Sequence, residues 1–500
     1  MNKEQTERGL VSFVTEAGTG KLLGYERRDG GGMEGIVTMK RPARSIGSHA
    51  LPWRDHFDLR QTNRFWQPRL PFAVAQVRFV DPTLPVNGVG TFASPLNALP
   101  ETLVTNTAYL LRSGTTYTGS RIANVGNVVF GAYGSGPKPI WDAGSADFCL
   151  SAASGVSRIV IRDISFTGQG RNLVTNASTT SKSASIDWLI TGCTFSLLPG
   201  SLAGDCSAIA LHGANIELLA NILSGVATHG AWIKGDNFEA SYNIVRYVGI
   251  DGQGNASCIH VAEGTKASIH HNHLDHSNTE GGCCIFIGST ATDADLRYNV
   301  LTHNLTGSQE SDVVRAEGAA KVAQNSVTGG RRGVFVGDAS TIESNIVVNE
   351  DPAGTAILLG QSSGAYLVRN NTVISKQRVA AKGVRYATST SPASLTIRNN
   401  IIAGFQVIGV EVQAVTTDQE SSNCYWDNVI NFDKSLSGSS VVLDPLLDEG
   451  FVPQQPALHF LGSVTDGAFK DIYGEVFQGA IGAAQYGDID YDGTLLPAYF

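Results

Sequence analysis

Six ionisable residues in the middle of the chain have the side chains that acid–base catalysis requires. They are Lys234, His260, Glu263, Asp312, Arg315 and Glu317. Hydrolysis of a glycosidic bond needs two carboxyl groups, about 5–5.5 Å apart for retention or about 6.5–9.5 Å apart for inversion. β-Elimination on a uronic acid needs a base, a proton donor and a group that neutralises the carboxylate, which Lys234, His260 and Arg315 could supply. The residue types leave both reactions open, and we favour hydrolysis.

Aromatic side chains lie among these ionisable residues. Trp232, Phe286 and Phe335 would offer flat apolar surfaces to the C–H faces of sugar rings if they were exposed. Arg331 and Arg385 would add charged contacts to the same substrate. The alternative is that the aromatic rings are buried under long loops or against a sister chain. For the group as a whole we favour sugar binding.

A repeating asparagine indicates which element positions these residues. An aliphatic side chain follows two residues after Asn221, Asn243, Asn272, Asn299, Asn325, Asn345, Asn371 and Asn400, at spacings of 20 to 29 residues. Cys193 and Ile164 fit the same frame without the asparagine. A repeat of this length indicates a solenoid, in which each unit buries its apolar face by stacking on its neighbours.

The content of each repeat indicates a parallel β-helix. Two short alternating runs recur, such as 256–261 and 267–270, and period-two alternation is typical of strands. Loops between such strands can vary in length without disturbing the stack. We expect the asparagine side chains to stack about 4.8 Å apart and to hydrogen-bond from coil to coil.

Motifs at both ends of this region resemble those of a known superfamily. The opening motif is Val77-Arg78-Phe79-Val80-Asp81-Pro82, with Gly90-Thr91, Pro95-Leu96 and a first coil that contains Gly114-Thr115. The closing motif runs from Asp444-Pro445 through Asp471 and Gly474 to Ile481-Gly482-Ala483-Ala484-Gln485-Tyr486. Both resemble the caps of right-handed parallel β-helix proteins of the pectate-lyase-like superfamily, with Gln485 where glutamate is usual. This superfamily includes lyases, hydrolases, isomerases, epimerases and non-enzymatic fibres.

The resemblance implies an all-β chain with a right-handed, single-stranded parallel β-helix of about ten or more coils. We expect a small irregular N-terminal head at 1–76 and a solenoid at 77–486. Within the solenoid we expect a cap at 77–125, coils at 126–430 and a closing region at 431–486. A tail at 487–500 would follow.

The resemblance also implies where a sugar would bind, on the strand that precedes the asparagine of each coil. If the flanking aliphatic residues point inward, the outward column is Ala210, Trp232, His260, Phe286, Arg315, Phe335, Leu358, Arg385 and Glu411. A second outward column contains His212, Lys234 and Glu317, with Glu263 at the end of its strand. Glu263 and Glu317 would then lie two coils apart, about 9–10 Å along the stack, near the inverting distance. Asp312 and Asp236 are alternative carboxylates from loops.

Within the superfamily the chain most resembles bacteriophage tailspikes and tail fibres, which are usually homotrimers. The first seven residues are polar, so we expect no secretory signal and synthesis in the host cytoplasm. Residues 1–80 carry a net charge of +5 and the remainder −14, which suits a head that docks on other proteins of the phage tail or baseplate. The resemblance implies a virion protein that binds bacterial surface polysaccharide and cleaves it by hydrolysis, cleaves it by β-elimination, or only binds it. Lys234 resembles a position of alginate-lyase-like enzymes, but the arginine expected one coil later is replaced by the run from His260 to Glu263.

The remaining sequence features predict no cofactor, metal, nucleic acid or membrane insertion. No stretch of 18 apolar residues occurs, and the seven cysteines lack the spacing of a disulfide framework or a zinc site, so we expect reduced packing residues. His270, His271, His273 and His276 lie close together in the sequence. Adjacent residues of a strand point to opposite faces, so His270 and His271 should not converge, and we expect a solvated face.

Overall fold

The computed structural model describes most of the predicted solenoid and part of the predicted head. The described residues are 2–5, 11–15, 22–27, 72–169, 172–176, 186–197, 206–249, 256–276, 281–304, 311–360, 364–386, 394–412, 418–458, 462 and 481–483. The chain divides into two compact units, one of Met1–Trp66 with Gly487–Phe500 and one of Gln67–Tyr486. The predicted tail at 487–500 and the aromatic, basic stretch at 40–69 lie outside the described residues.

The first unit contains a small antiparallel sheet. Its strands are β1 (Asn2–Gln5), β2 (Val11–Thr15) and β3 (Leu22–Arg27), in the order β1-β2-β3. Part of the N-terminal head is therefore regular structure.

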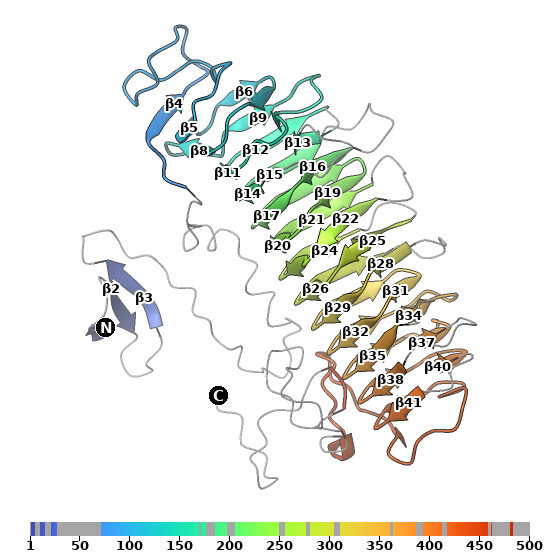
Figure 1. Ribbon diagram of the computed structural model, residues 1–500. Coiled ribbons are helices and arrows are strands. Elements are labelled where there is room, and N and C mark those ends of the chain that lie inside the picture. Colours follow the sequence, from blue (N-terminus) through green and yellow to red (C-terminus); the bar gives the residue numbers. More distant parts are fainter. Residues whose placement is uncertain are drawn as a thin grey trace. The chain divides into compact units, whose positions relative to one another are not determined.

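The second unit is a solenoid of about ten turns built from three parallel sheets, which Figure 1 shows as successive layers of strands. The 14 strands of the first sheet are β4 (Gln76–Val80), β5 (Thr107–Arg112), β8 (Val128–Tyr133), β11 (Ile159–Arg162), β14 (Ile186–Thr191), β17 (Ala214–Leu219), β20 (Glu239–Ser241), β23 (Ser268–His270), β26 (Ala294–Arg297), β29 (Ala320–Ala323), β32 (Ser340–Glu343), β35 (Ala365–Arg369), β38 (Ser394–Arg398) and β41 (Asp418–Ser421). The 14 strands of the second sheet are β6 (Thr116–Thr118), β9 (Ile140–Asp142), β12 (Ser165–Gly168), β15 (Thr194–Leu197), β18 (Ile222–Val226), β21 (Ile244–Val248), β24 (His273–Asp275), β27 (Val300–His303), β30 (Ser326–Gly329), β33 (Ile346–Val348), β36 (Thr372–Ile374), β39 (Ile401–Ala403), β42 (Cys424–Trp426) and β43 (Val441–Val442). The 12 strands of the third sheet are β7 (Arg121–Ala123), β10 (Leu150–Ala152), β13 (Asn172–Asn176), β16 (Ser207–His212), β19 (His229–Lys234), β22 (Ser257–Thr265), β25 (Gly282–Thr292), β28 (Ser311–Ala316), β31 (Arg332–Val336), β34 (Thr355–Leu359), β37 (Lys382–Tyr386) and β40 (Ile408–Val412). A short 3₁₀ helix, η2 (Pro456–Leu458), follows.

The predicted all-β parallel solenoid is confirmed, and each complete coil contains one strand from each sheet. The sequence showed two alternating runs in a coil, whereas the structure has three strands. The difference arises at the asparagine, because the run around it is divided by a tight turn: β20 ends at Ser241 and β21 begins at Ile244. At this corner the residue before the asparagine adopts a left-handed conformation, for example φ 57° at Tyr242 and 55° at His271.

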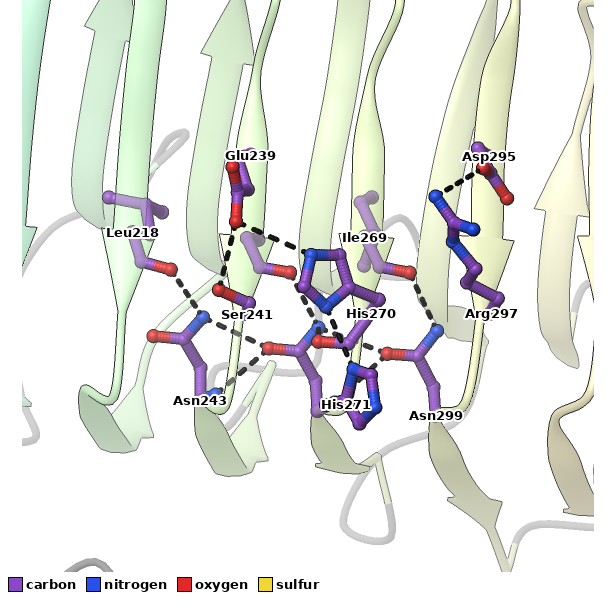
Figure 2. A network of polar contacts seen from close by, with 12 residues as sticks. Leu218, Glu239, Ser241, Asn243, Ile269, His270, His271, Asp295, Arg297 and Asn299 are labelled. Atoms are coloured by element: carbon purple, nitrogen blue, oxygen red, sulfur yellow. Dashed lines mark hydrogen bonds and ion pairs between the residues drawn. The ribbon is translucent and has the colours of Figure 1, made fainter. Parts of the chain in front are cut away.

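The asparagines form the predicted ladder inside these turns. Each side-chain amide donates to the next asparagine's Oδ1 at 2.9–3.0 Å through Asn221, Asn243, Asn272, Asn299, Asn325, Asn345, Asn371, Asn400 and Asn423. Every member is 0–2% exposed. Each amide also donates to a backbone carbonyl, as Asn243 does to Leu218 in Figure 2. The ladder satisfies backbone groups that the turns remove from the sheets.

The core between the three sheets is apolar and continuous. Large rings stack from coil to coil near its start, with centroids of Phe166 and Phe195 5.0 Å apart and of Trp141 and Phe166 5.7 Å apart. All seven cysteines are free and buried, as expected for packing residues. Burial raises the pKa of Cys149 and Cys193 to about 12, which keeps both thiols protonated and unreactive at neutral pH. Among the described residues no helix is long and apolar enough to cross a membrane.

Candidate functional site

The third sheet aligns the predicted outward column, residue for residue. The pairing runs from Ala210 through Trp232, His260, Phe286, Arg315, Phe335, Leu358 and Arg385 to Glu411. Ala210 is buried, and the other members are partly exposed. The members from Trp232 to Phe335 are hereafter the aromatic column. With strands about 4.8 Å apart, its four steps extend for about 19 Å.

Successive members of the aromatic column are in contact, and Arg315 is the cation among them. The His260 ring lies 4.4 Å from the Phe286 ring and 6.5 Å from the Trp232 ring, measured between centroids. The Arg315 guanidinium carbon lies 5.6 Å from the Phe286 centroid and 5.9 Å from the Phe335 centroid. These are cation–π distances. The two phenylalanines therefore hold the guanidinium group between them, and the rings are not isolated platforms.

Lys234 and Glu263 are joined across neighbouring strands. Lys234 Nζ lies 3.1 Å from Glu263 Oε1 and 5.0 Å from the Trp232 ring centroid. Glu263 was expected at the end of its strand, but β22 continues to Thr265. A β-bulge at Ala262 shifts the register, so that Lys234 pairs with Glu263. This bulge is what brings the carboxylate beside the ammonium group.

Glu317 accepts two hydrogen bonds from Arg315. The Nε and Nη2 atoms of Arg315 lie 3.0 Å and 2.6 Å from the same oxygen, Glu317 Oε1. The exposed fractions of the two side chains are 28% and 30%, so both can be reached from solvent. This carboxylate is held in one orientation while its second oxygen takes no part in the ion pair.

Asp312 is not a loop carboxylate, contrary to the prediction. It lies within β28, its side chain is 0% exposed, and it is bound by Arg332 from the next coil, whose Nη2 lies 2.8 Å from Asp312 Oδ2. Asp236, the other loop alternative, accepts hydrogen bonds from the backbone and hydroxyl of Thr265 at 2.8 Å and 3.1 Å. Both carboxylates are therefore engaged in contacts within the protein.

His260 is neutral at physiological pH. Burial, together with the nearby His229 and Lys234, lowers its pKa to about 3. Its ring meets the His229 ring edge-on with centroids 4.6 Å apart, and His229 belongs to β19 and not to a loop. A neutral imidazole can accept a proton or a hydrogen bond, but one with so low a pKa is a weak base.

The two predicted arginine contacts have different surroundings. Arg385 lies in the outward column, where its Nε is 2.7 Å from Glu411 Oε2 and Lys382 Nζ is 2.6 Å from the same oxygen. Arg331 is partly exposed at the turn before β31, and its backbone N–H donates to Ser311. Arg332 belongs to β31, and its guanidinium carbon lies 5.1 Å from the Phe335 centroid. Its register with Asp312 became visible only in the folded sheet.

A second histidine-containing cluster was misread from the sequence. His271 lies in the turn and not in the strand, and its Nδ1 is 2.9 Å from Nδ1 of His270 (Figure 2). The two rings converge, contrary to the prediction that they point apart. The asparagine repeat could have indicated that His271 lies in a turn, because Tyr242, His271 and Tyr298 each directly precede a ladder asparagine.

A surface hollow elsewhere on the solenoid does not coincide with these residues. It is lined by residues of four successive coils, including Thr105, Asn124, Ser157 and Ile186. Its only ionisable lining residue is Arg158. It lacks the paired groups of the third sheet and is not a candidate for catalysis.

Comparison with known proteins gives one partial family match. Residues 288–440 match the family described as periplasmic copper-binding protein (NosD), which is less than a third of the chain. No curated protein matches.

Several solved structures are similar in fold. The GH136 lacto-N-biosidase from Eubacterium ramulus is 12% identical with a TM-score of 0.40, and the match covers 74% of this chain and 67% of that one. The PL6 family alginate lyase AlyGC is 12% identical with a TM-score of 0.41, covering 79% and 56%. XylC in complex with xylose is 10% identical with a TM-score of 0.43, covering 84% and 97%. At these identities the likeness is one of fold, and what these proteins act on is not carried over to this chain.

Proposed function

We propose that this chain binds an extended polysaccharide along the third sheet and hydrolyses it. The observation that carries the proposal is the aromatic column, in which Trp232, Phe286 and Phe335 stand in register with His260 and Arg315 between them. Partly exposed rings bind the C–H faces of sugars, and the neighbouring charged groups bind their hydroxyls. The regular strand spacing suits a polymer, because it repeats the same type of contact along one line.

The carboxylates of Glu263 and Glu317 are the proposed catalytic pair. Glu263 lies in β22 and Glu317 directly follows β28, and these two strands are separated by β25, so their backbones lie about 9–10 Å apart, near the range for inversion. Lys234 makes one contact with the more exposed Glu263, whereas Arg315 makes two with Glu317. Glu263 is therefore the carboxylate that substrate can more easily separate from its cation, and we assign it as the general acid. Glu317, held by Arg315, is assigned as the base that activates water.

A product assay on a panel of bacterial surface glycans tests this assignment. New reducing ends should appear with the wild-type chain, while Glu263→Gln and Glu317→Gln should each abolish cleavage and leave glycan binding intact. Glu217→Gln is the matched control, because Glu217 is an exposed carboxylate on the first sheet. Unchanged cleavage in both site variants would refute the carboxylate assignment.

β-Elimination is the second candidate, because the third sheet carries Lys234, His260 and Arg315 on β19, β22 and β28. Lys234 could act as base, and Arg315 could neutralise the uronate carboxylate. His260, with its pKa of about 3, is the weakest part of this alternative. An unsaturated product that absorbs in the ultraviolet would replace the hydrolysis proposal with this one. Binding without any product would instead indicate an adhesive fibre.

We further propose that the chain is a phage tailspike that attaches to the virion through residues 1–76 and works as a homotrimer. The resemblance of its terminal motifs to tailspikes and its division into two compact units support this setting. Sedimentation of the purified chain should give the mass of a trimer, three times 52.9 kDa. A monomer that cleaves glycan equally well would remove the trimer from the proposal.

A further inference from the structure

The His270–His271 pair lies at the corner between the first and second sheets, away from the third-sheet column. His270 is the last residue of β23, and His271 occupies the left-handed turn position with φ 55°. This turn swings the His271 ring alongside His270 and brings the two Nδ1 atoms to 2.9 Å (Figure 2). The rings meet almost at a right angle, with an interplanar angle of 87°.

Both rings are held in place by other residues. The His271 ring stacks between two tyrosine rings from the neighbouring coils, 5.0 Å from Tyr242 and 4.9 Å from Tyr298, with interplanar angles of 18° and 27°. The His270 ring is fixed at its other nitrogen, since Nε2 lies 3.3 Å from Glu239 Oε1. The two Nδ1 atoms are therefore pre-positioned, which lowers the cost of binding a shared ligand.

The contact with Glu239 determines which nitrogen of His270 is free to bind. A carboxylate accepts a hydrogen bond, so Nε2 of His270 carries the proton and Nδ1 presents its lone pair to His271. In the present arrangement His271 donates its Nδ1–H to that lone pair. A metal ion can take the place of this proton when His271 changes to its Nε2–H tautomer.

We propose that His270 and His271 chelate a single divalent transition-metal ion through their two Nδ1 atoms, with Cu²⁺ or Ni²⁺ preferred over Zn²⁺. Metal–nitrogen bonds of about 2.0–2.1 Å across a 2.9 Å separation correspond to a nitrogen–metal–nitrogen angle of about 90°. Square-planar and octahedral ions accept this angle. A tetrahedral zinc ion would instead need nitrogen atoms about 3.3–3.4 Å apart.

Glu239 supports the metal site without binding the ion. It orients His270 as carboxylates commonly orient metal-bound histidines. Within the described residues no group of three histidine, cysteine or acidic side chains is placed to hold an ion, so water would fill the remaining positions. The match to the NosD family covers residues 288–440 and contains neither His270 nor His271, so it gives no support for a metal ion at this pair.

Calorimetric titration of the untagged full-length chain with Cu²⁺, Ni²⁺ and Zn²⁺ tests the proposal. We expect one equivalent of Cu²⁺ to bind, with two nitrogen ligands in its electron paramagnetic resonance spectrum, and Zn²⁺ to bind at least tenfold more weakly. His271→Asn should lower the Cu²⁺ affinity at least a hundredfold and should still fold, because Asn370 and Asn399 adopt the same left-handed turn. Glu239→Ala should lower the affinity about 10- to 100-fold.

The control is His273→Val, which removes a neighbouring histidine on β24 whose strand partners are Ile244 and Val300. It should leave binding unchanged. Equal Cu²⁺ binding by wild type and His271→Asn would mean an adventitious ion only and would overturn the proposal. A lack of stoichiometric binding, or tighter binding of Zn²⁺ than Cu²⁺, would overturn it as well. None of these results depends on glycan cleavage, so this proposal and the polysaccharide proposal can fail separately.

Discussion

Replacing Asn299 with alanine removes one rung of the buried asparagine ladder. Its amide donates to Ile269 O at 2.8 Å and to Asn325 Oδ1 at 3.0 Å. Its Oδ1 accepts from the backbone N–H and the side-chain amide of Asn272, both at 3.0 Å. After the substitution, the Asn272 amide keeps its bond to Ala240 O, and Asn325 Oδ1 keeps its bond from the Asn299 N–H.

One buried backbone group therefore loses its partner, the N–H of Asn272. An unsatisfied buried group costs about 1–3 kcal/mol, so the expected loss is about 1–3 kcal/mol. Because a solenoid coil contacts only its neighbours, the loss should be concentrated in the adjacent coils. Hydrogen exchange is a suitable assay, since it reports the opening of each segment separately. The Asn272 amide should exchange about 5-fold to 140-fold faster, which is this loss converted at about 1.4 kcal/mol per tenfold change.

A surface asparagine pair supplies the control. Asn215 accepts a hydrogen bond from Asn237 at 3.1 Å and donates to Asp187 at 2.9 Å, but it is exposed. Glycine can adopt the left-handed backbone conformation of Asn215, with φ 55°. Asn215→Gly should therefore lower the free energy of unfolding by less than about 1 kcal/mol. If Asn299→Ala left exchange of Asn272 unchanged, or if both variants lost equal stability, burial of the ladder would not be what stabilises the coils.

Three further predictions concern the third sheet and the buried histidines. Trp232→Ala should weaken glycan binding about tenfold, near 1.4 kcal/mol, as measured by calorimetry, and Trp426→Ala, an exposed tryptophan outside the column, should not. Arg332→Leu should destabilise the chain by about 3–5 kcal/mol in denaturant, because the buried Asp312 loses its ion pair with Arg332, and Arg332→Leu with Asp312→Leu should recover most of that loss. His276 and His303 are 0% exposed and stacked, with centroids 4.9 Å apart, and burial lowers their pKa values to about 4 and about 3. As pH decreases, the unfolded chain binds protons at these histidines before the folded chain does. The free energy of unfolding should therefore be unaffected by them above about pH 6.5 and should fall as pH decreases toward 4, by about 3 kcal/mol for His276. A chain with glutamine at both positions that kept the same pH slope would contradict this last prediction.

The sequence by itself determined the architecture, because every coil uses the same residue types to bury its apolar face and to form its corner. An inward aliphatic pattern and one buried asparagine recur, so the sequence alone specifies the register of the third sheet from Trp232 to Glu411. Asn423 is the last asparagine of the ladder and accepts a hydrogen bond from Asn400. Its motif, Asn423-Cys424-Tyr425, has a tyrosine where the other motifs have an aliphatic residue.

Only the tertiary structure decided which charged groups meet. A single extra residue in β22 places Glu263 beside Lys234, and a coil-to-coil pairing buries Asp312 under Arg332. A left-handed turn, and not strand alternation, decides that His270 and His271 converge. Periodicity specifies which face of a strand a residue occupies, but bulges, turns and neighbouring coils set the side-chain distances on which pairing and chemistry depend.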